Sequence, residues 1–274
     1  MGIAWANVVW RHTWWGVRSM LVDYEPHRVV PPHVHPEEHI YVLTRGTYCA
    51  AVDGAAPVSC RPGAIVFRPA RQAHWDQISP EGCTSVRLEL PPICRPWLPT
   101  GPGYCFSESL AERCAVLAQQ QQTSRRERAR AYVELFTLLW DMRVRLLECG
   151  SRAWVVRLLD LLAHGERAVE FSTPERVAAR VGVGRSTLQE WAFRHGGVAI
   201  GRLLRQARVL SAAQRVVGSS TPLASIAVDL GYADQSHLTR EFRSWLGTTP
   251  GCLRGNGSTD EGNGSQRTVA TPKR

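Results

Sequence analysis

Four histidines in the N-terminal part of the sequence have a spacing that suits metal or small-molecule chemistry: His33, His35, His39 and His74. Residues two apart on a β-strand face the same side, so His33 and His35 are predicted to point into one interior. Imidazole nitrogens bind Zn, Ni, Cu or Fe, and His39 and His74 complete a set of four ligands. This set holds no carboxylate to offset the charge of a cation. The alternative is that the same histidines line a pocket.

Two aromatic residues, Tyr41 and Trp75, lie close to these histidines in the sequence. If the histidines line a pocket, the predicted residues that bind a small effector are His33, His35, Tyr41, His74 and Trp75. Ordinary core packing is the other explanation for both aromatic residues. No general acid or base accompanies the histidines, so the sequence predicts no catalytic residue.

A second group of polar residues lies near the C-terminus, on one face of a predicted helix. Asp234 is predicted to cap the start of this helix, and its buried face is formed by Leu238, Phe242, Trp245 and Leu246. The opposite face carries donors and acceptors suited to base edges and phosphates: Gln235, Ser236, Thr239, Arg240 and Arg243. A solvated helix in any all-α domain is the alternative.

A shorter predicted helix precedes this one. Its apolar residues recur at helical spacing: Leu223, Ile226, Ala227 and Leu230. Thr221 is predicted as its N-cap, with Pro222 at the first helical position. Gly231 ends the helix, because glycine enters a left-handed turn without a Cβ penalty. Two apolar helices that meet at a glycine turn describe a helix-turn-helix.

The same pattern occurs earlier in the chain. Gly182 lies 49 residues before Gly231, and Leu188 lies 50 residues before Leu238. The sequence therefore contains a duplicated helix-turn-helix. Apolar residues recur between the copies from Ile200 onward and predict a connecting helix of roughly 18 residues, about 27 Å long. Such a helix places two recognition helices near one DNA turn apart, about 34 Å.

The run from Ile226 to Pro250 resembles the second helix-turn-helix of the AraC/XylS family of bacterial transcription regulators. The residues at the family's spacing are Ile226, Ala227, Gly231, Tyr232, Ser236, Leu238, Arg240, Phe242, Gly247 and Pro250. The resemblance implies that the first copy also reads DNA, through Arg185, Ser186 and Gln189. That copy departs from the family at Glu190, where an arginine is usual. A carboxylate repels phosphates, although it can accept from cytosine N4.

Short β-branched or aromatic runs separated by turn signals predict an antiparallel barrel in the N-terminal part. The predicted strands are 17–24, 40–44, 48–52, 64–67 and 85–90. Residues 33–46 and 63–74 resemble the two motifs of the cupin barrel, which forms the sensor domain of many AraC-type regulators. Two positions depart from the cupin pattern: His39 replaces the acidic ligand, and Arg71 replaces a glycine.

Two amphipathic helical segments are predicted after the proline-rich stretch 90–103, from 107 or 108 to 122 and from 124 to 147. In the family, such helices pack on the barrel and often form the dimer contact. Packing within one chain alone explains the same apolar stripes, so both alternatives stay open.

Composition agrees with a protein that binds a polyanion. The 274 residues carry a formal charge of +9, and nearly all basic residues are arginine, whose shape suits phosphate and guanine. The sequence contains neither a membrane span nor a signal peptide. Eight scattered cysteines form no CxxC pair and are interpreted as reduced thiols.

The predicted fold is an α+β multidomain chain. Its segments are an N-terminal cupin-like antiparallel β-barrel that senses an effector (1–92), a helical connector for dimerisation (93–150), an all-α DNA-binding domain with two helix-turn-helix motifs (151–253) and a disordered tail (254–274). We expect no required cofactor, with a transition metal such as zinc left open at the histidines.

These observations together predict a sequence-specific transcription regulator of the AraC type that is not an enzyme. The expected partners are promoter DNA, a small effector, a second copy of the chain and, for an activator, RNA polymerase, with no membrane. The expected location is the bacterial cytoplasm, on the nucleoid. The alternatives are a metal-dependent cupin enzyme fused to a DNA-binding domain, and a regulator that responds to no effector.

Overall fold

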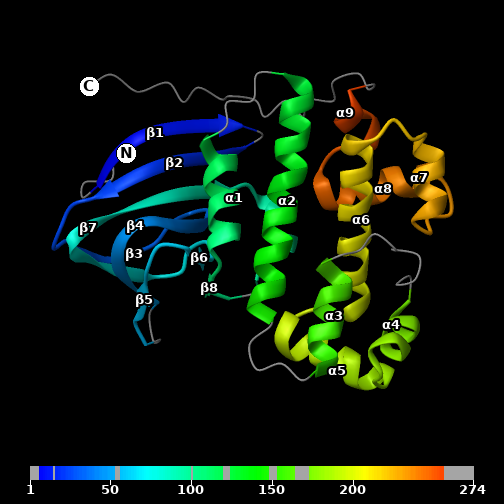
Figure 1. Cartoon of the computed structure of the whole chain (residues 1–274), viewed down its shortest axis with the longest axis horizontal. Helices are drawn as coiled ribbons and strands as arrows, with labels where there is room; N and C mark the ends of the chain where they lie inside the picture. The colour runs from blue at the N-terminus through cyan, green and yellow to red at the C-terminus, as the bar shows by residue number, and fades with distance from the viewer. Residues whose placement is uncertain are drawn as a thin grey trace, which may run out of the picture.

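A computed structural model of the chain places an antiparallel sheet at one side, two long helices in the middle and a cluster of helices at the other side (Figure 1). The structure describes residues 6–14, 16–52, 56–99, 101–119, 124–147, 153–163 and 173–255. The predicted tail, 254–274, lies outside the described residues from 256 onward, as does Cys149, whereas its first residue, Arg254, ends a short helix (Pro250–Arg254).

Within the described residues, one antiparallel sheet of eight strands runs in the order β1-β2-β7-β4-β6-β8, with β3 paired to β7 and β5 paired to β4. The strands are β1 (Ala6–Trp14), β2 (Val17–Tyr24), β3 (Val29–His33), β4 (Glu38–Val52), β5 (Val58–Cys60), β6 (Ala64–Arg68), β7 (His74–Leu90) and β8 (Gly103–Phe106). The long strands β4 and β7 pair along both of their halves, so they belong to both layers of the barrel-like domain.

The bend in β4 depends on a glycine. Gly46 has φ +72°, and a Cβ at this position would lie 2.0 Å from the carbonyl oxygen of Gly82 in β7. The register between β4 and β7 shifts on both sides of Gly46. The separate strands predicted at 40–44 and 48–52 are therefore one strand, because the chain bends at Gly46 instead of reversing.

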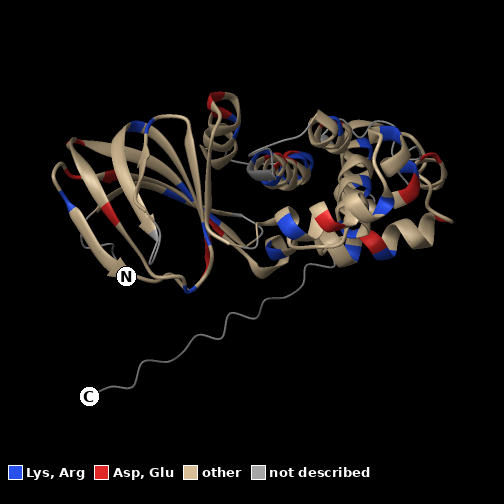
Figure 2. Cartoon of the chain, turned by 90° about the horizontal axis from the view of Figure 1, so that it is seen from below, with Lys and Arg blue, Asp and Glu red and all other residues tan. Residues whose placement is uncertain are grey.

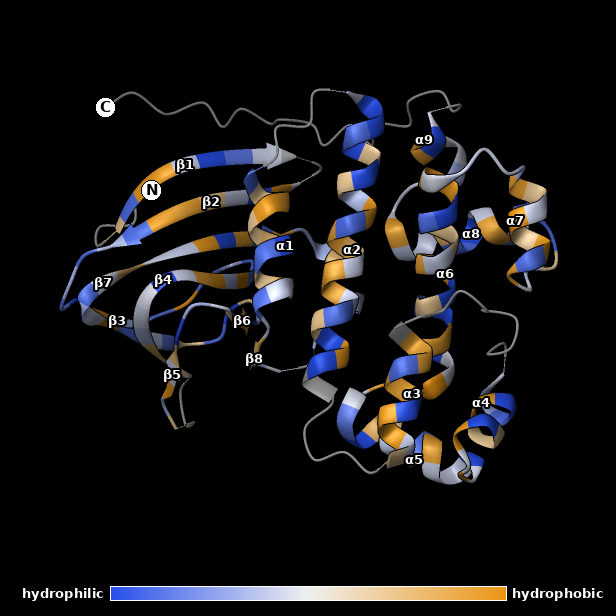
Figure 3. Cartoon of the chain, in the orientation of Figure 1, coloured by the Kyte–Doolittle hydropathy of each residue, from blue (hydrophilic) through white to orange (hydrophobic). Residues whose placement is uncertain are grey.

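Both faces of this sheet are buried, against different partners. The outer face is apolar and packs on helices, and its core includes Val42, Phe67 and Leu88. Alternate residues of the same strands face the interior, where Tyr41 and Leu43 pack together. The strands are consequently apolar on one side and mixed on the other, and in Figure 3 both hydrophobic (orange) and hydrophilic (blue) stretches occur along them.

The proline-rich stretch forms a short 3₁₀ helix, η1 (Pro92–Trp97), rather than only a domain edge. It is followed by α1 (Glu108–Gln119) and α2 (Arg125–Leu147), close to the predicted bounds. Helix α1 lies on the sheet, and α2 lies between α1 and the C-terminal helices (Figure 2). Buried side chains such as Leu135, Phe136 and Trp140 belong to the core that joins the sheet to these helices. The apolar stripe of α2 is therefore used within the chain.

The C-terminal part is all-α, as predicted. Its helices are α3 (Ala153–Ala163), α4 (Pro174–Val181), α5 (Arg185–Gly196), α6 (Ile200–Gly218), α7 (Leu223–Asp229), α8 (Gln235–Leu246) and α9 (Pro250–Arg254). Figure 1 shows α6 between the two helix-turn-helix copies, α4–α5 at one end and α7–α8 at the other. Its 19 residues give a length of about 28 Å.

The helix ends follow the sequence signals in most places. Thr173 caps α4 and Asp234 caps α8, each by accepting from a backbone N–H. Gly231 has φ +73°, as the predicted turn requires. The prediction for Thr221 is wrong: Pro222 is the N-cap of α7, and no side chain caps that helix.

The predicted fold class is confirmed: an N-terminal antiparallel sheet is joined by helices to an all-α part with two helix-turn-helix motifs. Strands β1, β3, β5 and β8 were not predicted, and β4 and β7 are longer than expected. The seven cysteines in the described residues are free thiols, and burial raises the pKa of Cys60 to about 11. No helix in the described part of the chain is long and apolar enough to cross a membrane.

We expect Gly46→Ala to lower the free energy of unfolding of the full chain by about 3 kcal/mol, because the added Cβ meets the Gly82 carbonyl in a left-handed conformation. Gly201→Ala in α6 is the control, since no described atom lies within 4 Å of its new Cβ, and we expect a gain of up to about 1 kcal/mol. Chemical denaturation measures both. Equal midpoints for Gly46→Ala and the wild type would contradict the role of this glycine.

Candidate functional site

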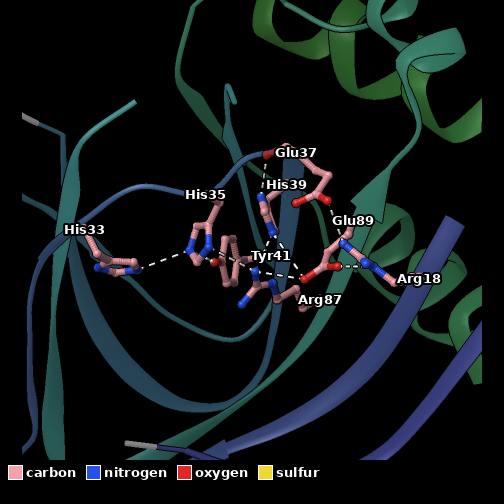
Figure 4. Close-up of polar contacts among 8 residues, drawn as sticks. All are labelled: Arg18, His33, His35, Glu37, His39, Tyr41, Arg87 and Glu89. Atoms are coloured by element: carbon pink, nitrogen blue, oxygen red, sulfur yellow. Dashed lines mark hydrogen bonds and ion pairs between the residues drawn. The ribbon is translucent and has the colours of Figure 1, made fainter. Parts of the chain in front are cut away.

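The structure brings three of the predicted histidines together at one end of the sheet interior. Ring nitrogens of His33, His35 and His74 all lie within 4.8 Å of one another. His33 and His74 come from paired strands, β3 and β7, in which they are directly opposite each other. His35 follows β3, and its ring lies between those of His33 and Tyr41 (Figure 4).

Two predicted site residues are not part of this group of three, although the ring centroid of His39 lies only 4.3 Å from that of His35. His39 is fully buried, and its Nδ1 donates to the carbonyl oxygen of Glu37 at 2.8 Å, while its Nε2 is bonded by Arg87. Trp75 follows His74 directly in β7, so its side chain lies on the opposite face of that strand. The structure therefore keeps Tyr41 beside the histidines but not Trp75.

Hydrogen bonds to backbone carbonyls assign the tautomers of two histidines. His33 Nδ1 lies 2.8 Å from the carbonyl oxygen of Pro31, and His74 Nδ1 lies 3.0 Å from that of Gln72. Both Nδ1 atoms are therefore donors, and both Nε2 atoms keep a lone pair. The Nε2 of His74 is buried without a partner among the described residues.

His35 has the other tautomer, because an arginine occupies its Nδ1. Arg87 Nη2 lies 3.2 Å from His35 Nδ1, and a guanidinium can only donate. His35 Nε2 must then carry the proton, which it donates to His33 Nε2 at 3.1 Å. Burial, with the charge of Arg87, lowers the pKa of His35 to about 2, so the ring is neutral at physiological pH.

Two arginines that the sequence analysis missed occupy the same interior. Arg68 is 2% exposed and Arg87 is 5% exposed. Arg68 forms an ion pair with Asp76, and Arg87 forms one with Glu89 at 3.0 Å. Each arginine occupies an inward position of a strand that is otherwise apolar. A charged residue is unusual at such a position, and this is the signal in the sequence that could have identified them.

This donor set does not fit a metal ion held by all three histidines. His33 and His74 present lone pairs, as metal ligands do, and their Nδ1 atoms have the carbonyl partners usual for such ligands. His35 does not, since Arg87 holds its Nδ1 and forces the proton onto Nε2. The guanidinium charge beside His35 also repels a cation. We therefore derive no function through a metal at this site.

The predicted DNA-contacting residues lie on two helices that are the second members of their helix-turn-helix motifs. Arg185, Ser186 and Gln189 are in α5, and the second copy contributes Gln235, Ser236, Thr239, Arg240 and Arg243 from α8. All are exposed except Gln189 and Thr239, which are partly buried. Thr239 donates to the carbonyl oxygen of Gln235 at 2.9 Å. The buried face of α8 consists of the four residues predicted for it.

The first copy differs in its charge. Glu190 occupies the position of Arg240 and forms an i,i+4 ion pair with Arg194, and both side chains are exposed. Arg185 pairs with Glu175 of α4 at 3.0 Å. Two arginines of the first copy are thus paired with carboxylates, whereas Arg240 and Arg243 have no ion pair within the described residues.

The connector holds the C-terminal ends of both recognition helices, a feature the sequence analysis missed. Arg143 of α2 is 3% exposed and donates to the carbonyl oxygen of Gly196, the last residue of α5, at 3.0 Å. At α8, Tyr132 of α2 donates to the carbonyl oxygen of Leu246, and Trp97 of η1 donates to that of Trp245 at 2.9 Å.

Arg143 is an unusual buried cation. Its other hydrogen bonds go to the carbonyl oxygen of Pro96 at 3.0 Å and the amide oxygen of Gln206 at 3.3 Å. Burial lowers its pKa to about 10, so it stays protonated. The negative end of the α5 dipole, at Gly196, favours this charge.

Comparison with known proteins identifies the C-terminal part. A family model described as a helix-turn-helix domain matches residues 177–256. A search of curated proteins finds no match. The resemblance to AraC/XylS-type regulators is thereby confirmed over the matched residues, which form the helix-turn-helix domain of a DNA-binding transcription regulator.

Solved structures resemble the chain more weakly. ToxT from Vibrio cholerae is 8% identical, with 85% of this chain and 96% of that chain covered and a TM-score of 0.37. Oxalate decarboxylase from Bacillus subtilis is 18% identical over 27% of this chain, at a TM-score of 0.25, and the match spans 20% of that enzyme's chain. A Rhizobium leguminosarum protein of unknown function is 17% identical over 31% of this chain, at a TM-score of 0.28. These likenesses do not assign an activity.

We expect Arg87→Met to increase the affinity of the full chain for Zn²⁺ by about tenfold or more, because it removes a positive charge beside His35 and frees its Nδ1. Titration against a zinc chelator measures this affinity. Arg45→Met, at an exposed arginine of β4, is the control and should leave it unchanged. Stoichiometric zinc in purified wild type, or no gain in Arg87→Met, would show that Arg87 does not oppose a cation.

Proposed function

We propose that this protein is a bacterial cytoplasmic transcription regulator in which a small effector, bound inside the N-terminal sheet, alters how two recognition helices engage promoter DNA. The observation that carries this proposal is the contact of one connector with both recognition helices, at Gly196 and at Leu246. The helix-turn-helix match supports DNA binding. The small effector and its influence on DNA binding are the parts that we propose in addition.

Charge and exposure support the DNA-binding surface. Residues 173–255 contain eleven arginines and five acidic residues, a formal charge of +6 out of the +9 of the whole chain. Figure 2 shows basic residues (blue) on several of the C-terminal helices. Phosphate contacts by arginines supply affinity, while short side chains at the start of a recognition helix, such as Gln235 and Ser236, select bases. The exposed N-terminal residues of α5 and α8 are the proposed contacts.

The connector supports a route from the sheet to DNA. Helix α1 packs on the sheet and on α2, and α2 packs on α6. A shift of α2 relative to the C-terminal helices changes the position of both recognition helices together, because its hydrogen bonds end at both. An effector that binds one arrangement of the sheet more tightly thus shifts the population of DNA-competent molecules.

The proposed domain boundaries remain those derived from the sequence, 1–92, 93–150, 151–253 and 254–274, with one refinement. The connector is packed against both neighbours, so we treat 93–150 as the coupling element of the regulator. Its dimerisation role is proposed for α1, whose Val116 is half exposed, since α2 is largely buried within the chain. RNA polymerase is the further partner if the regulator activates transcription.

We expect Arg240→Ala to weaken binding of the full chain to duplex DNA by a similar factor across sequences and to lower the salt slope of log K by about 1, as the loss of one phosphate contact does. Gln235→Ala should instead change preference at one or two base pairs, by about 1–3 kcal/mol each. Fluorescence anisotropy at several salt concentrations measures both. Arg113→Ala on α1 is the control, and an unchanged salt slope for Arg240→Ala would remove Arg240 from the contacts.

We expect Arg143→Met to weaken binding to an operator selected from random duplexes by about tenfold without changing the salt slope, because the recognition helices lose their common support while no phosphate contact is lost. Tyr132→Phe is a milder second variant in case Arg143→Met does not fold. Arg28→Met, at a half-exposed arginine between β2 and β3, is the control. Wild-type affinity in both folded variants would show that the connector does not position the recognition helices.

A further inference from the structure

Two arginine side chains converge on one aromatic ring in the interior of the sheet. Tyr41 and Arg87 are directly opposite in β4 and β7, and Arg68 lies opposite His39 in β4, so all three side chains face inward. The Cζ atoms of Arg68 and Arg87 lie 5.3 Å and 5.5 Å from the Tyr41 ring centroid.

Part of the hydrogen-bonding capacity of these arginines is unused. In the described part of the structure, Nε and Nη1 of Arg68 and Nε of Arg87 are buried without a partner. The hydroxyl of Tyr48 and Nε2 of His74, from the facing layer of the same interior, are also buried and unpartnered. Asp76 satisfies only one nitrogen of Arg68, and Glu89 is shared between Arg87 and Arg18.

Unused donors on a buried guanidinium are costly, because the group has lost water and gained no acceptor. Arginine nitrogens cannot accept, so only a molecule with acceptor atoms relieves them. Asp76 and Glu89 already pair with these arginines, so selection for an acceptor comes from their free N–H groups, which a cation cannot occupy. The neutral state of His35, held by Arg87, adds no competing positive charge.

We propose that the effector of this regulator is a small carboxylate, bound through Arg68 and Arg87 inside the sheet. This inference rests on the proposed function, since it names the ligand class of the same sensor site. A carboxylate supplies acceptors to the free nitrogens of both arginines in charge-assisted hydrogen bonds. The unpartnered Nε2 of His74 is an acceptor and fits a hydroxyl or another donor on the body of the ligand.

The other side chains of this interior determine which ligand body fits beside the carboxylate. Leu43, Val66 and Ile78 belong to the apolar cluster that continues from Tyr41 and Tyr48. His33 and His35, which are only partly buried, form the more open end of the interior next to the exposed Val34. A carboxylate with a short apolar body therefore matches the site better than a highly charged anion.

The test uses the full chain and three probe pairs: sodium acetate with acetamide, sodium lactate with lactamide, and sodium benzoate with benzamide. Thermal unfolding is followed against each probe, with sodium chloride at equal ionic strength as reference. We expect at least one carboxylate to raise Tm in a saturable way and to bind about tenfold or more tightly than its amide. Inorganic phosphate is tested in the same series.

Variants locate the effect. The double variant Arg68→Gln with Asp76→Asn removes the charge while keeping a hydrogen-bonding pair of similar size, and it should lose the Tm rise. Arg45→Gln, at an exposed arginine of β4, should keep it. If the double variant does not fold, Arg87→Gln is used in its place. The comparison of each carboxylate with its amide on the wild type tests the ligand class without any variant.

Several outcomes overturn the inference: no carboxylate raising Tm beyond chloride, an amide binding as tightly as its carboxylate, phosphate stabilising as strongly as the best carboxylate, or a rise that persists in the double variant. DNA binding by the wild type is measured in parallel. Binding to DNA without any response to carboxylates removes the ligand class and leaves the proposed regulator standing. No binding to DNA removes the proposed function whatever the thermal series shows.

Discussion

The arrangement of the C-terminal half depends on hydrogen bonds from one connector to the last carbonyls of two recognition helices. A helix C-terminus leaves carbonyls without intrahelical partners, and these must be satisfied when they are buried. Here Arg143, Tyr132 and Trp97 supply the donors. Because the donors come from η1 and α2, the two helix-turn-helix copies are fixed to the same support as well as to α6. Their exposed N-terminal ends stay free for a ligand.

The sheet is buried on both faces, so side chains on each face must find packing or hydrogen-bonding partners. Its outer face has apolar residues such as Val42 and Leu88 that pack on helices, so the sheet and the connector share one core. Its inner face combines an apolar cluster with the polar group around Tyr41. The interior is therefore separated from α1 by the thickness of a single sheet.

The arginines of the C-terminal helices and those of the sheet interior differ in exposure and pairing. The C-terminal helices carry exposed arginines suited to phosphates, whereas Arg68 and Arg87 are buried and paired with carboxylates. Buried ion pairs of this kind contribute little net stability, because desolvation offsets their attraction. Arg87 alone determines the tautomer of His35, which limits what the histidines can bind.

The sequence by itself determined the elements whose signals are local. Helical periodicity predicted α8 and its buried face, with Asp234 as its cap and glycines at 231 and 247 marking where helices end. The resemblance to a family supplied the predicted DNA contacts. The fold class followed from the same patterns. Local signals were insufficient for Thr221, for the bend at Gly46, and for the short strand β3, which pairs with the distant β7.

Only the tertiary structure decided which histidines meet and what surrounds them. Spacing alone grouped His39 and Trp75 with the others. The structure keeps the His39 ring 4.3 Å from that of His35 but engages both of its nitrogens, whereas strand alternation turns Trp75 to the far face. The same holds for Arg143, whose contact with Gly196 spans 53 residues. Such contacts carry no periodic signal, because they depend on how separate elements pack rather than on the residues beside them in the chain.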